Sequence, residues 1–352
     1  MAKGRIGLDI GSTAVRAAEL SPGPQPTVIR AAQVPLPPGA LENGEVRDPE
    51  LVAEALRKLW EDGGFKGRQV WLGVGNQRVV VREIALPFLP EKELRQSLGF
   101  QVQEFIPMPV DEAVLDYDPI GEFEQEDRKM LRMLLVAAQR TMVDLLVAAV
   151  QAAKLEPMGL DLIPFALVRA VGTPDVGMDL DEPGDEAIID IGSHVTNIVV
   201  HARGATRFVR ILPSGGRDIT VTIARAASIE DDVAERLKRG IEVDEPEAPK
   251  PEDVRQVALQ RAGSFVDEIR SSLEFYTAQT RDARIARVLI TGGGSRLDGL
   301  LDLMRQRIPV PVDAGQVFSR APSQLMLSEA ATAEAEPVLA TAVGLAIPGG
   351  EK

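Results

Sequence analysis

Short apolar runs separated by polar turns recur along the chain and predict a mixed α/β protein. Residues 6–9 form an apolar run that ends in Asp-Ile-Gly-Ser, and residues 15–20 continue as the second strand of a hairpin. The same tetrapeptide returns inside residues 187–200, which again have the pattern strand, turn, strand. Residues 51–60 carry apolar side chains at helical spacing. The pattern therefore predicts two similar strand hairpins, nearly half a chain apart.

The pattern changes between residues 70 and 158. Residues 70–74 and 78–86 predict two strands around Gly75-Asn76, which is a hairpin turn signal. Residues 90–106 start a helix with acidic residues in its first turn. Residues 130–138 suit a strand, although their Leu and Met would equally suit a helix, and residues 142–154 are helical. We interpret residues 70–158 as a compact inserted α+β unit.

The second half alternates strands, glycine turns and helices. Residues 206–212 predict a strand, and residues 287–291 predict a short strand that enters Gly292, Gly293, Gly294 and Ser295. Residues 251–276 and 297–307 predict helices, and residues 337–350 predict a helix of small apolar residues. Residues 175–185 form an acidic loop, and the Pro- and Glu-rich residues 242–253 predict a mobile surface linker.

Composition narrows the class of protein. The chain has 352 residues, enough for two domains, and a net charge of -14, which disfavours a nucleic-acid-binding surface. It has no cysteine and only two histidines, so thiolate metal sites are excluded and a histidine-rich site is disfavoured. No stretch reaches the roughly 18 apolar residues of a membrane span, and we find no signal peptide. We expect a cytoplasmic protein that reaches a membrane only through a partner.

The repeated turn carries the candidate chemistry. The chain lacks a Walker motif, and the segment at Gly73 lacks the third glycine of a dinucleotide fingerprint. A tight Gly-Ser turn instead points backbone N–H groups at one spot, which suits phosphate oxygens. The aspartate before it can hold hydrated Mg²⁺, which prefers one or two carboxylates plus water and phosphate. Two such hairpins facing each other would clamp a phosphate chain, and the later glycine turn would admit a nucleoside.

The order of these three turns resembles the actin-like ATPase superfamily. The resemblance implies an α/β actin-like ATPase fold with two ribonuclease-H-like domains, and ATP or ADP with Mg²⁺ as ligands. It also implies that Asp9 and Asp190 hold Mg²⁺ through water, and that Glu235 and Lys238 lie near the ribose and base. The nucleotide-contacting residues implied by the resemblance are Asp9, Gly11, Ser12, Thr13, Asp190, Gly192, Ser193, Thr196, Glu235, Lys238, Gly292, Gly293, Gly294 and Ser295.

Longer phrases narrow the resemblance. Residues 82–113, which include LPFLPEKEL and EFIPMP, and residues 268–300 are similar to the type IV pilus assembly protein PilM family. The resemblance implies that residues 70–158 form an SHS2-like subdomain 1C, inserted before a helix over residues 159–171. It implies subdomain 1A at 1–69 and 159–184, subdomain 2A at 185–225 and 286–352, and subdomain 2B at 226–285.

The resemblance implies an adaptor rather than a fast enzyme. PilM-like proteins are cytoplasmic and bind the N-terminal tail of the membrane protein PilN, and other pilus motor components are further candidate partners. Phe100 and Phe105 are candidate residues of the peptide groove, against the alternative that they are core residues. The predicted helix over 159–171 offers Asp161 but no Gln or Glu to orient an attacking water, and His194 is interpreted as a loop residue, so we expect at most a slow ATPase.

Three alternatives stay open from the sequence. An FtsA-like self-assembling actin homologue is the first, although no amphipathic segment follows Pro348. A cytoplasmic component of the GspL type is the second. A sugar or acetate kinase of the same superfamily is the third, and it ranks last because nothing in residues 70–158 looks like a sugar site.

Overall fold

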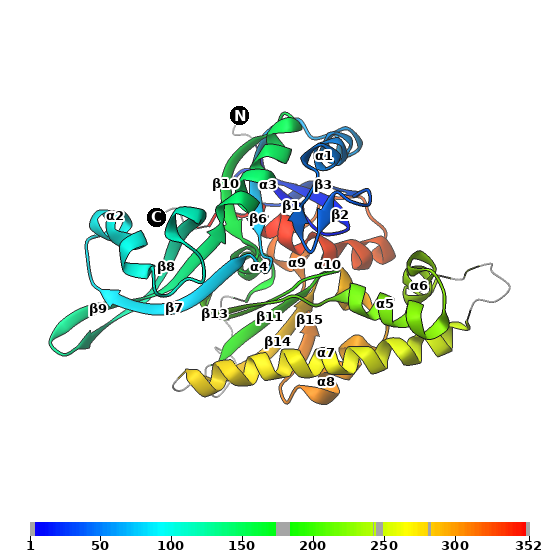
Figure 1. The fold of residues 1–352 in the computed structure, drawn as a ribbon. Coiled ribbons are helices and arrows are strands. Elements are labelled where there is room, and N and C mark those ends of the chain that lie inside the picture. Colours follow the sequence, from blue (N-terminus) through cyan, green and yellow to red (C-terminus); the bar gives the residue numbers. More distant parts are fainter. Residues whose placement is uncertain (1–3, 174–183, 242, 244–248, 281–282, 350–352) are drawn as a thin grey trace.

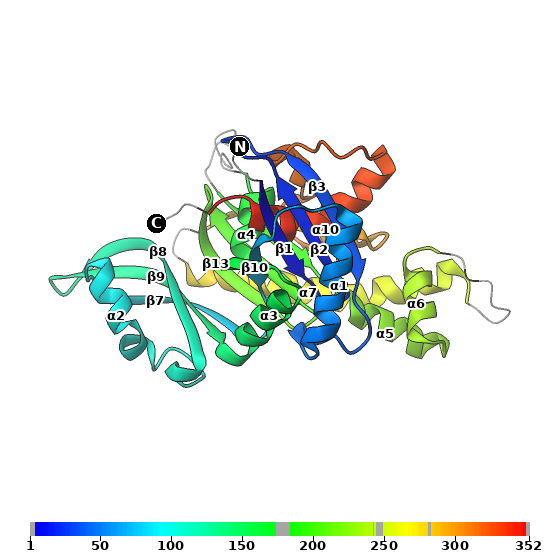
Figure 2. The same ribbon diagram turned by 90° about the horizontal axis from the view of Figure 1, so that it is seen from above.

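The computed structural model describes residues 4–173, 184–241, 243, 249–280 and 283–349. They form two bodies, each built on a five-stranded sheet, with a smaller three-stranded unit at one side (Figures 1 and 2). The acidic loop predicted over 175–185 falls mostly outside the described residues, as does half of the predicted linker. Of that linker, residues 251–253 are instead the first turn of a helix.

The two large sheets share one topology. In the first sheet the order is β10-β6-β1-β2-β3, and in the second it is β15-β14-β11-β12-β13. In both, three antiparallel strands are followed by a strand that pairs in parallel with the first and by another that pairs in parallel with this fourth strand. The strands of the first sheet are β1 (Arg5–Ile10), β2 (Ala14–Leu20), β3 (Val28–Pro35), β6 (Gln69–Val74) and β10 (Glu156–Leu162). Those of the second are β11 (Asp185–Ile191), β12 (Thr196–Ala202), β13 (Ala205–Leu212), β14 (Ile285–Thr291) and β15 (Val312–Ala314). The duplicated turn is thus part of a duplicated sheet.

Helices cover both sheets. On the first body lie α1 (Pro49–Gly63) and α3 (Arg140–Ala152), with the short hairpin β4 (Leu41–Glu42) and β5 (Glu45–Val46) nearby. On the second lie α5 (Gly216–Ala227), α6 (Asp231–Lys238), α7 (Pro251–Gln279) and α8 (Leu300–Arg307). Local chemistry sets the ends of α1, because Asp48 accepts hydrogen bonds from the N–H groups of Glu50 and Leu51, and Gly64 ends the helix in the left-handed conformation.

A third layer lies between the two sheets. It contains α4 (Ile163–Val171), α9 (Val317–Arg320) and α10 (Glu329–Ala346), whose apolar side chains share one core with residues of both sheets. The small residues of α10 permit backbone contact. A Cβ at Gly7 would lie 2.0 Å from the carbonyl oxygen of Ala342, and a Cβ at Gly344 would lie 2.0 Å from that of Ala166. Glycine is therefore needed at both contacts. Among the described helices, none is long and apolar enough to cross a membrane.

The three-stranded unit has its own small core. Its sheet order is β7-β9-β8, with β7 (Val79–Pro87), β8 (Ala113–Gln125) and β9 (Arg128–Gln139). The helix α2 (Glu91–Val102) packs on this sheet, and the short helix η1 (Val110–Glu112) connects α2 to β8. Figure 2 shows this unit extending from one side of the first body. Its strands lie inside the range predicted for subdomain 1C, and the subdomain boundaries themselves stay predictions.

Two expectations for this region are wrong. The predicted hairpin around Gly75-Asn76 does not form, because β6 pairs with β1 and β10 while β7 pairs with β9. Val70 and Leu72 are buried in the first core, so β6 belongs to the large sheet. The predicted helix over 159–171 begins only at Ile163, because the preceding residues form the edge strand β10. The strand alternative for residues 130–138 is correct.

Candidate functional site

Two equivalent turns face each other across the gap between the two sheets. In the first, the N–H of Gly11 donates to the carbonyl oxygen of Ala14 at 3.1 Å, and in the second, that of Gly192 donates to Val195 at 2.9 Å. Asp9 and Asp190 occupy the same place in the two strands that lead into the turns. The structure therefore brings the two Asp-Ile-Gly-Ser segments together as two similar halves of one site.

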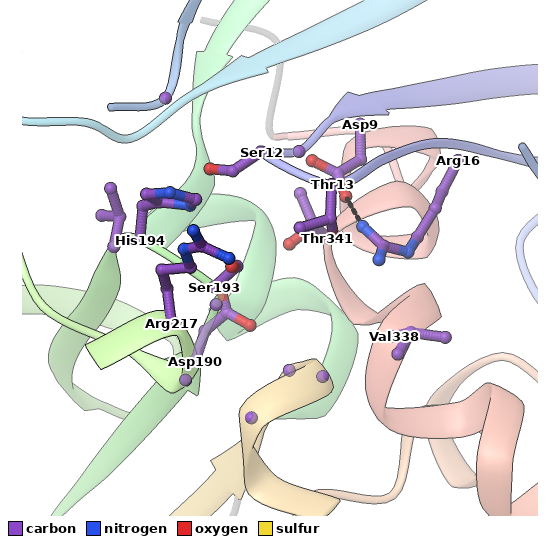
Figure 3. Close-up of a pocket in the computed structure, with 18 of the residues that line it drawn as sticks. Asp9, Ser12, Thr13, Arg16, Asp190, Ser193, His194, Arg217, Val338 and Thr341 are labelled. Atoms are coloured by element: carbon purple, nitrogen blue, oxygen red, sulfur yellow. Dashed lines mark hydrogen bonds and ion pairs between the residues drawn. The ribbon is translucent and has the colours of Figure 1, made fainter. Parts of the chain in front are cut away.

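A cleft of about 680 Å³ lies between the turns. Figure 3 shows Asp9, Ser12 and Thr13 from one body opposite Asp190, Ser193 and His194 from the other. Twelve of the fourteen predicted nucleotide-contacting residues line this cleft: Asp9, Gly11, Ser12, Thr13, Asp190, Gly192, Ser193, Glu235, Lys238, Gly292, Gly293 and Gly294. A cleft of this size, with both apolar and polar walls, suits a small-molecule ligand.

The third turn presses against the second. Gly292 has a φ of 85°, and a Cβ there would lie 2.5 Å from the Oδ1 of Asp190. Gly294 has as little room, since its Cβ would lie 2.5 Å from a side-chain carbon of Ile191. The short helix η2 (Gly293–Arg296) thus forms a wall of the cleft made of bare backbone, which a flat ligand group can approach closely.

Both aspartates are buried, and burial raises the pKa of each carboxyl group. Burial, and then the charge of Asp9, raise the pKa of Asp190 to about 7. Burial also raises the pKa of Asp9, although the guanidinium of Arg16, 3.2 Å from Asp9 Oδ2, opposes this shift. Two buried carboxylates with incomplete compensation fit a divalent cation. Among the described residues, no group of three or more His, Cys, Asp or Glu side chains could hold a metal ion.

Cations line the cleft of this acidic protein. They are Arg16, Arg217, Lys238, Arg239 and Arg296. Lys238 is held by Glu235 at 2.6 Å and donates to the hydroxyl of Thr220 at 2.8 Å and to the carbonyl oxygen of Gly216 at 3.0 Å. The carboxyl groups of Asp9, Asp190, Glu235 and Glu334 line the same cleft, so its cations outnumber its carboxyl groups by one although the chain as a whole carries -14.

Two of the predicted residues do not line the cleft. Thr196 is fully buried and donates to the carbonyl oxygen of Ser214 at 2.8 Å. Strand alternation explains this, because Thr196 is one residue away from Asn197, which lies opposite Asp190 and does line the cleft. Ser295 turns back to donate to the carbonyl oxygen of Gly292 at 2.7 Å.

Sequence reasoning missed several residues of the cleft wall. Arg16, Asn197 and Thr341 line it, and Figure 3 shows Arg16 beside Asp9 and Thr341 near Thr13. Arg16 and Asn197 could have been found by extending each hairpin and pairing the strands, since each lies directly across from its aspartate. Thr341 comes from α10, far along the chain, and carries no local signal. Asp161 is engaged by Arg169 and lies outside the cleft lining.

The two candidate groove residues have different surroundings. Phe100 on α2 is 87% exposed, whereas Phe105 is partly buried against the core of the three-stranded unit. Phe100 therefore exposes its ring to solvent, whereas Phe105 packs partly against this core. That either residue lines a peptide groove stays a prediction.

The two similar sheets and the paired turns define the actin-like fold. An MreB protein of Spiroplasma citri with bound ADP has this fold at 12% identity, with a TM-score of 0.53 over 97% of this chain and 95% of the other. The cell division protein FtsA of Pseudomonas aeruginosa is 22% identical over 382 residues, covering 99% of this chain and 89% of FtsA.

The family model of the type IV pilus assembly protein PilM matches residues 7–349. This chain therefore belongs to the PilM family. A chain in a solved PilM-PilN type IV pilus biogenesis complex is 28% identical to it, with a TM-score of 0.85 and 99% of each chain covered.

Proposed function

We propose that this chain is a nucleotide-binding adaptor of the type IV pilus inner-membrane complex, and that it binds the N-terminal cytoplasmic tail of a PilN-like membrane protein. The observation that carries the proposal is family membership over nearly the whole chain, joined to the 28% identity with the solved PilM-PilN complex. Such a partner would recruit a cytoplasmic chain to the inner face of the membrane. Other pilus motor components are further candidate partners.

The cleft supports ATP or ADP with Mg²⁺ as its ligand. Ser12, Thr13 and Ser193 would bind phosphate oxygens through hydroxyl and backbone N–H groups. Asp9 and Asp190 would hold hydrated Mg²⁺, which neutralises phosphate charge. Gly292–294 would face the adenosine, with Glu235 and Lys238 beside it.

We propose that the nucleotide acts mainly as a conformational ligand. Ile163, rather than a Gln or Glu, stands where α4 begins at the cleft, and the carboxylate of Asp161 is engaged by Arg169. These groups supply no clear general base, so hydrolysis is expected to be slow. A ligand that contacts both turns stabilises the closed arrangement of the two bodies in proportion to its preference for that arrangement.

A peptide-binding experiment tests the adaptor proposal. A synthetic peptide from the cytoplasmic tail of the PilN-like protein of the same genome should bind the full chain, and more tightly with Mg²⁺-ATP. Phe100→Ala should weaken binding about tenfold, the effect of removing an exposed aromatic anchor from an interface. Titration by fluorescence anisotropy measures both effects.

The control is Phe275→Ala, which removes a ring that is 44% exposed on α7 of the second body. It should leave peptide affinity unchanged. Absence of peptide binding both with and without nucleotide would contradict the adaptor function. Equal losses in the two variants would remove Phe100 from the groove.

A self-assembling FtsA-like role is the second candidate, favoured by the match to FtsA over 99% of this chain. Sedimentation separates the two. We expect the chain to stay in the supernatant with or without Mg²⁺-ATP, and a nucleotide-dependent pellet would support the filament instead.

A further inference from the structure

The two halves of the cleft are copies that differ at two polar side chains facing it. When the duplicated turns are aligned on Asp9 and Asp190, Thr13 corresponds to His194 and Arg16 corresponds to Asn197. The backbone of the two turns is closed by the same hydrogen bond. The difference between the halves is therefore chemical, and lies in these substituted side chains.

Both substitutions leave a buried polar atom unsatisfied. Among the described residues, Nδ1 of His194 and Oδ1 of Asn197 are buried without a hydrogen-bond partner, and both residues line the cleft. In the first half, Arg16 is satisfied by Asp9 and by Gln33 at 2.7 Å. A buried polar group without a partner is unfavourable, and a bound ligand can supply the missing hydrogen bond. The second turn is therefore the half prepared to contact a ligand through side chains.

His194 does not stand alone. Arg217, in the first turn of α5, lines the same cleft, and Figure 3 shows its guanidinium beside the imidazole of His194, with Ser12 across from them. Burial, and then the charge of Arg217, lower the pKa of His194, so the ring is neutral at pH 7. A neutral imidazole donates one hydrogen bond without adding charge, while Arg217 supplies the charge.

This pair lies at one end of the cleft. The turn between β4 and β5 closes that end, since a Cβ at Gly44 would lie 3.9 Å from the Oγ of Ser12 and 3.6 Å from a methyl group of Val195. In Figure 3, Arg16 and Val338 lie on the other side of the aspartates. A phosphate chain that starts near the third turn would end beside Ser12, His194 and Arg217.

We propose that His194 and Arg217 contact the terminal phosphate of a nucleoside triphosphate and make the cleft prefer a triphosphate to a diphosphate. The inference rests on the proposed nucleotide-binding function and assigns to these two residues the selection between ligand states. A triphosphate would join Ser12 of one body to His194 and Arg217 of the other. A diphosphate would leave His194 Nδ1 without a hydrogen-bond partner and Arg217 with Asp231 as its anion.

The test measures the affinity of the full chain for the non-hydrolysable triphosphate analogue AMPPNP and for ADP, both with Mg²⁺, by calorimetry. The wild-type chain should prefer AMPPNP. His194→Thr, which restores the residue of the first turn, and Arg217→Gln should each weaken AMPPNP binding about tenfold, as expected for one hydrogen bond to a charged group, and leave ADP binding unchanged.

The matched control is Arg225→Gln, the same change at an exposed position in the last turn of α5, which should alter neither affinity. Since Arg217 also pairs with Asp231, thermal melting of each variant reports whether the fold is kept. Equal loss of AMPPNP and ADP binding, or an unchanged preference in both variants, would overturn the assignment. Failure of the wild-type chain to bind either nucleotide would contradict the nucleotide-binding function itself.

Discussion

Gly344→Ala is expected to destabilise the protein by about 2–3 kcal/mol, the upper part of the range for overpacking a core. The added methyl group would lie 2.0 Å from the carbonyl oxygen of Ala166, so α10 and α4 must move apart. Because α10 also carries Thr341 and Val338 into the cleft, nucleotide affinity should fall with stability. Urea denaturation and nucleotide titration measure the two effects.

Gly121→Ala is the control for this change. Gly121 lies in β8, and a Cβ there would meet nothing within 4 Å. The free energy of unfolding of this variant should therefore differ from that of the wild-type chain by no more than about 0.5 kcal/mol. If Gly344→Ala unfolds at the same urea concentration as the wild-type chain, the close contact between the two helices is not required.

Asp190→Asn is expected to raise the thermal stability of the nucleotide-free protein at pH 8 and to abolish its stabilisation by Mg²⁺-ATP. The pKa of Asp190 lies at about 7 in the folded protein, against 3.8 as the ordinary value. Between these values the folded state holds a proton that the unfolded state has lost, so stability falls as the pH rises. Above pH 7 the wild-type chain bears the full cost of a buried charge, which is on the order of a few kcal/mol and which asparagine avoids.

The advantage of Asp190→Asn should therefore shrink as the pH is lowered from 8 to 5, where wild-type Asp190 is protonated. Melting curves in EDTA across this range measure it. A cation must replace that proton, so Mg²⁺-ATP should bind the wild-type chain more tightly as the pH rises toward 7. A pH-independent difference between the two proteins would show that burial does not shift this carboxyl, and retained Mg²⁺-ATP stabilisation in the variant would remove Asp190 from the metal site.

Glycine and aspartate positions at turns made the core of the site predictable. Asp9, Gly11, Asp190 and Gly192 are local signals, because a tight turn after a buried strand restricts which residues fit. The actin-like fold followed from their order along the chain. The helix predicted over residues 51–60 forms as α1, and the neighbouring residues Asp48 and Gly64 set its two ends.

The pairing of strands could not be predicted from such local sequence signals. Val70 and Val79 begin similar apolar runs around a plausible turn, yet their strands enter different sheets, because pairing depends on which core buries each run. The prediction that Thr196 lines the cleft was wrong for a related reason, because a shift of one residue along a strand moves a side chain to the opposite face of the sheet. Thr341 depended on α10 packing between the bodies, a contact that links distant parts of the chain.

The duplicated sheets give this cleft a freedom that a symmetric homodimer lacks. In a homodimer every mutation appears in both subunits, so two half-sites stay identical even when their shared ligand is asymmetric. Here the two copies lie in one chain, and each half-site can specialise separately. The two half-sites differ in this way. In the first, Arg16 pairs with Asp9 and balances its charge, whereas in the second, Asn197 lies beside Asp190 and leaves its Oδ1 without a hydrogen-bond partner. Exchanging the residues of one half for those of the other would therefore restore the symmetry of the cleft at the expense of its specificity.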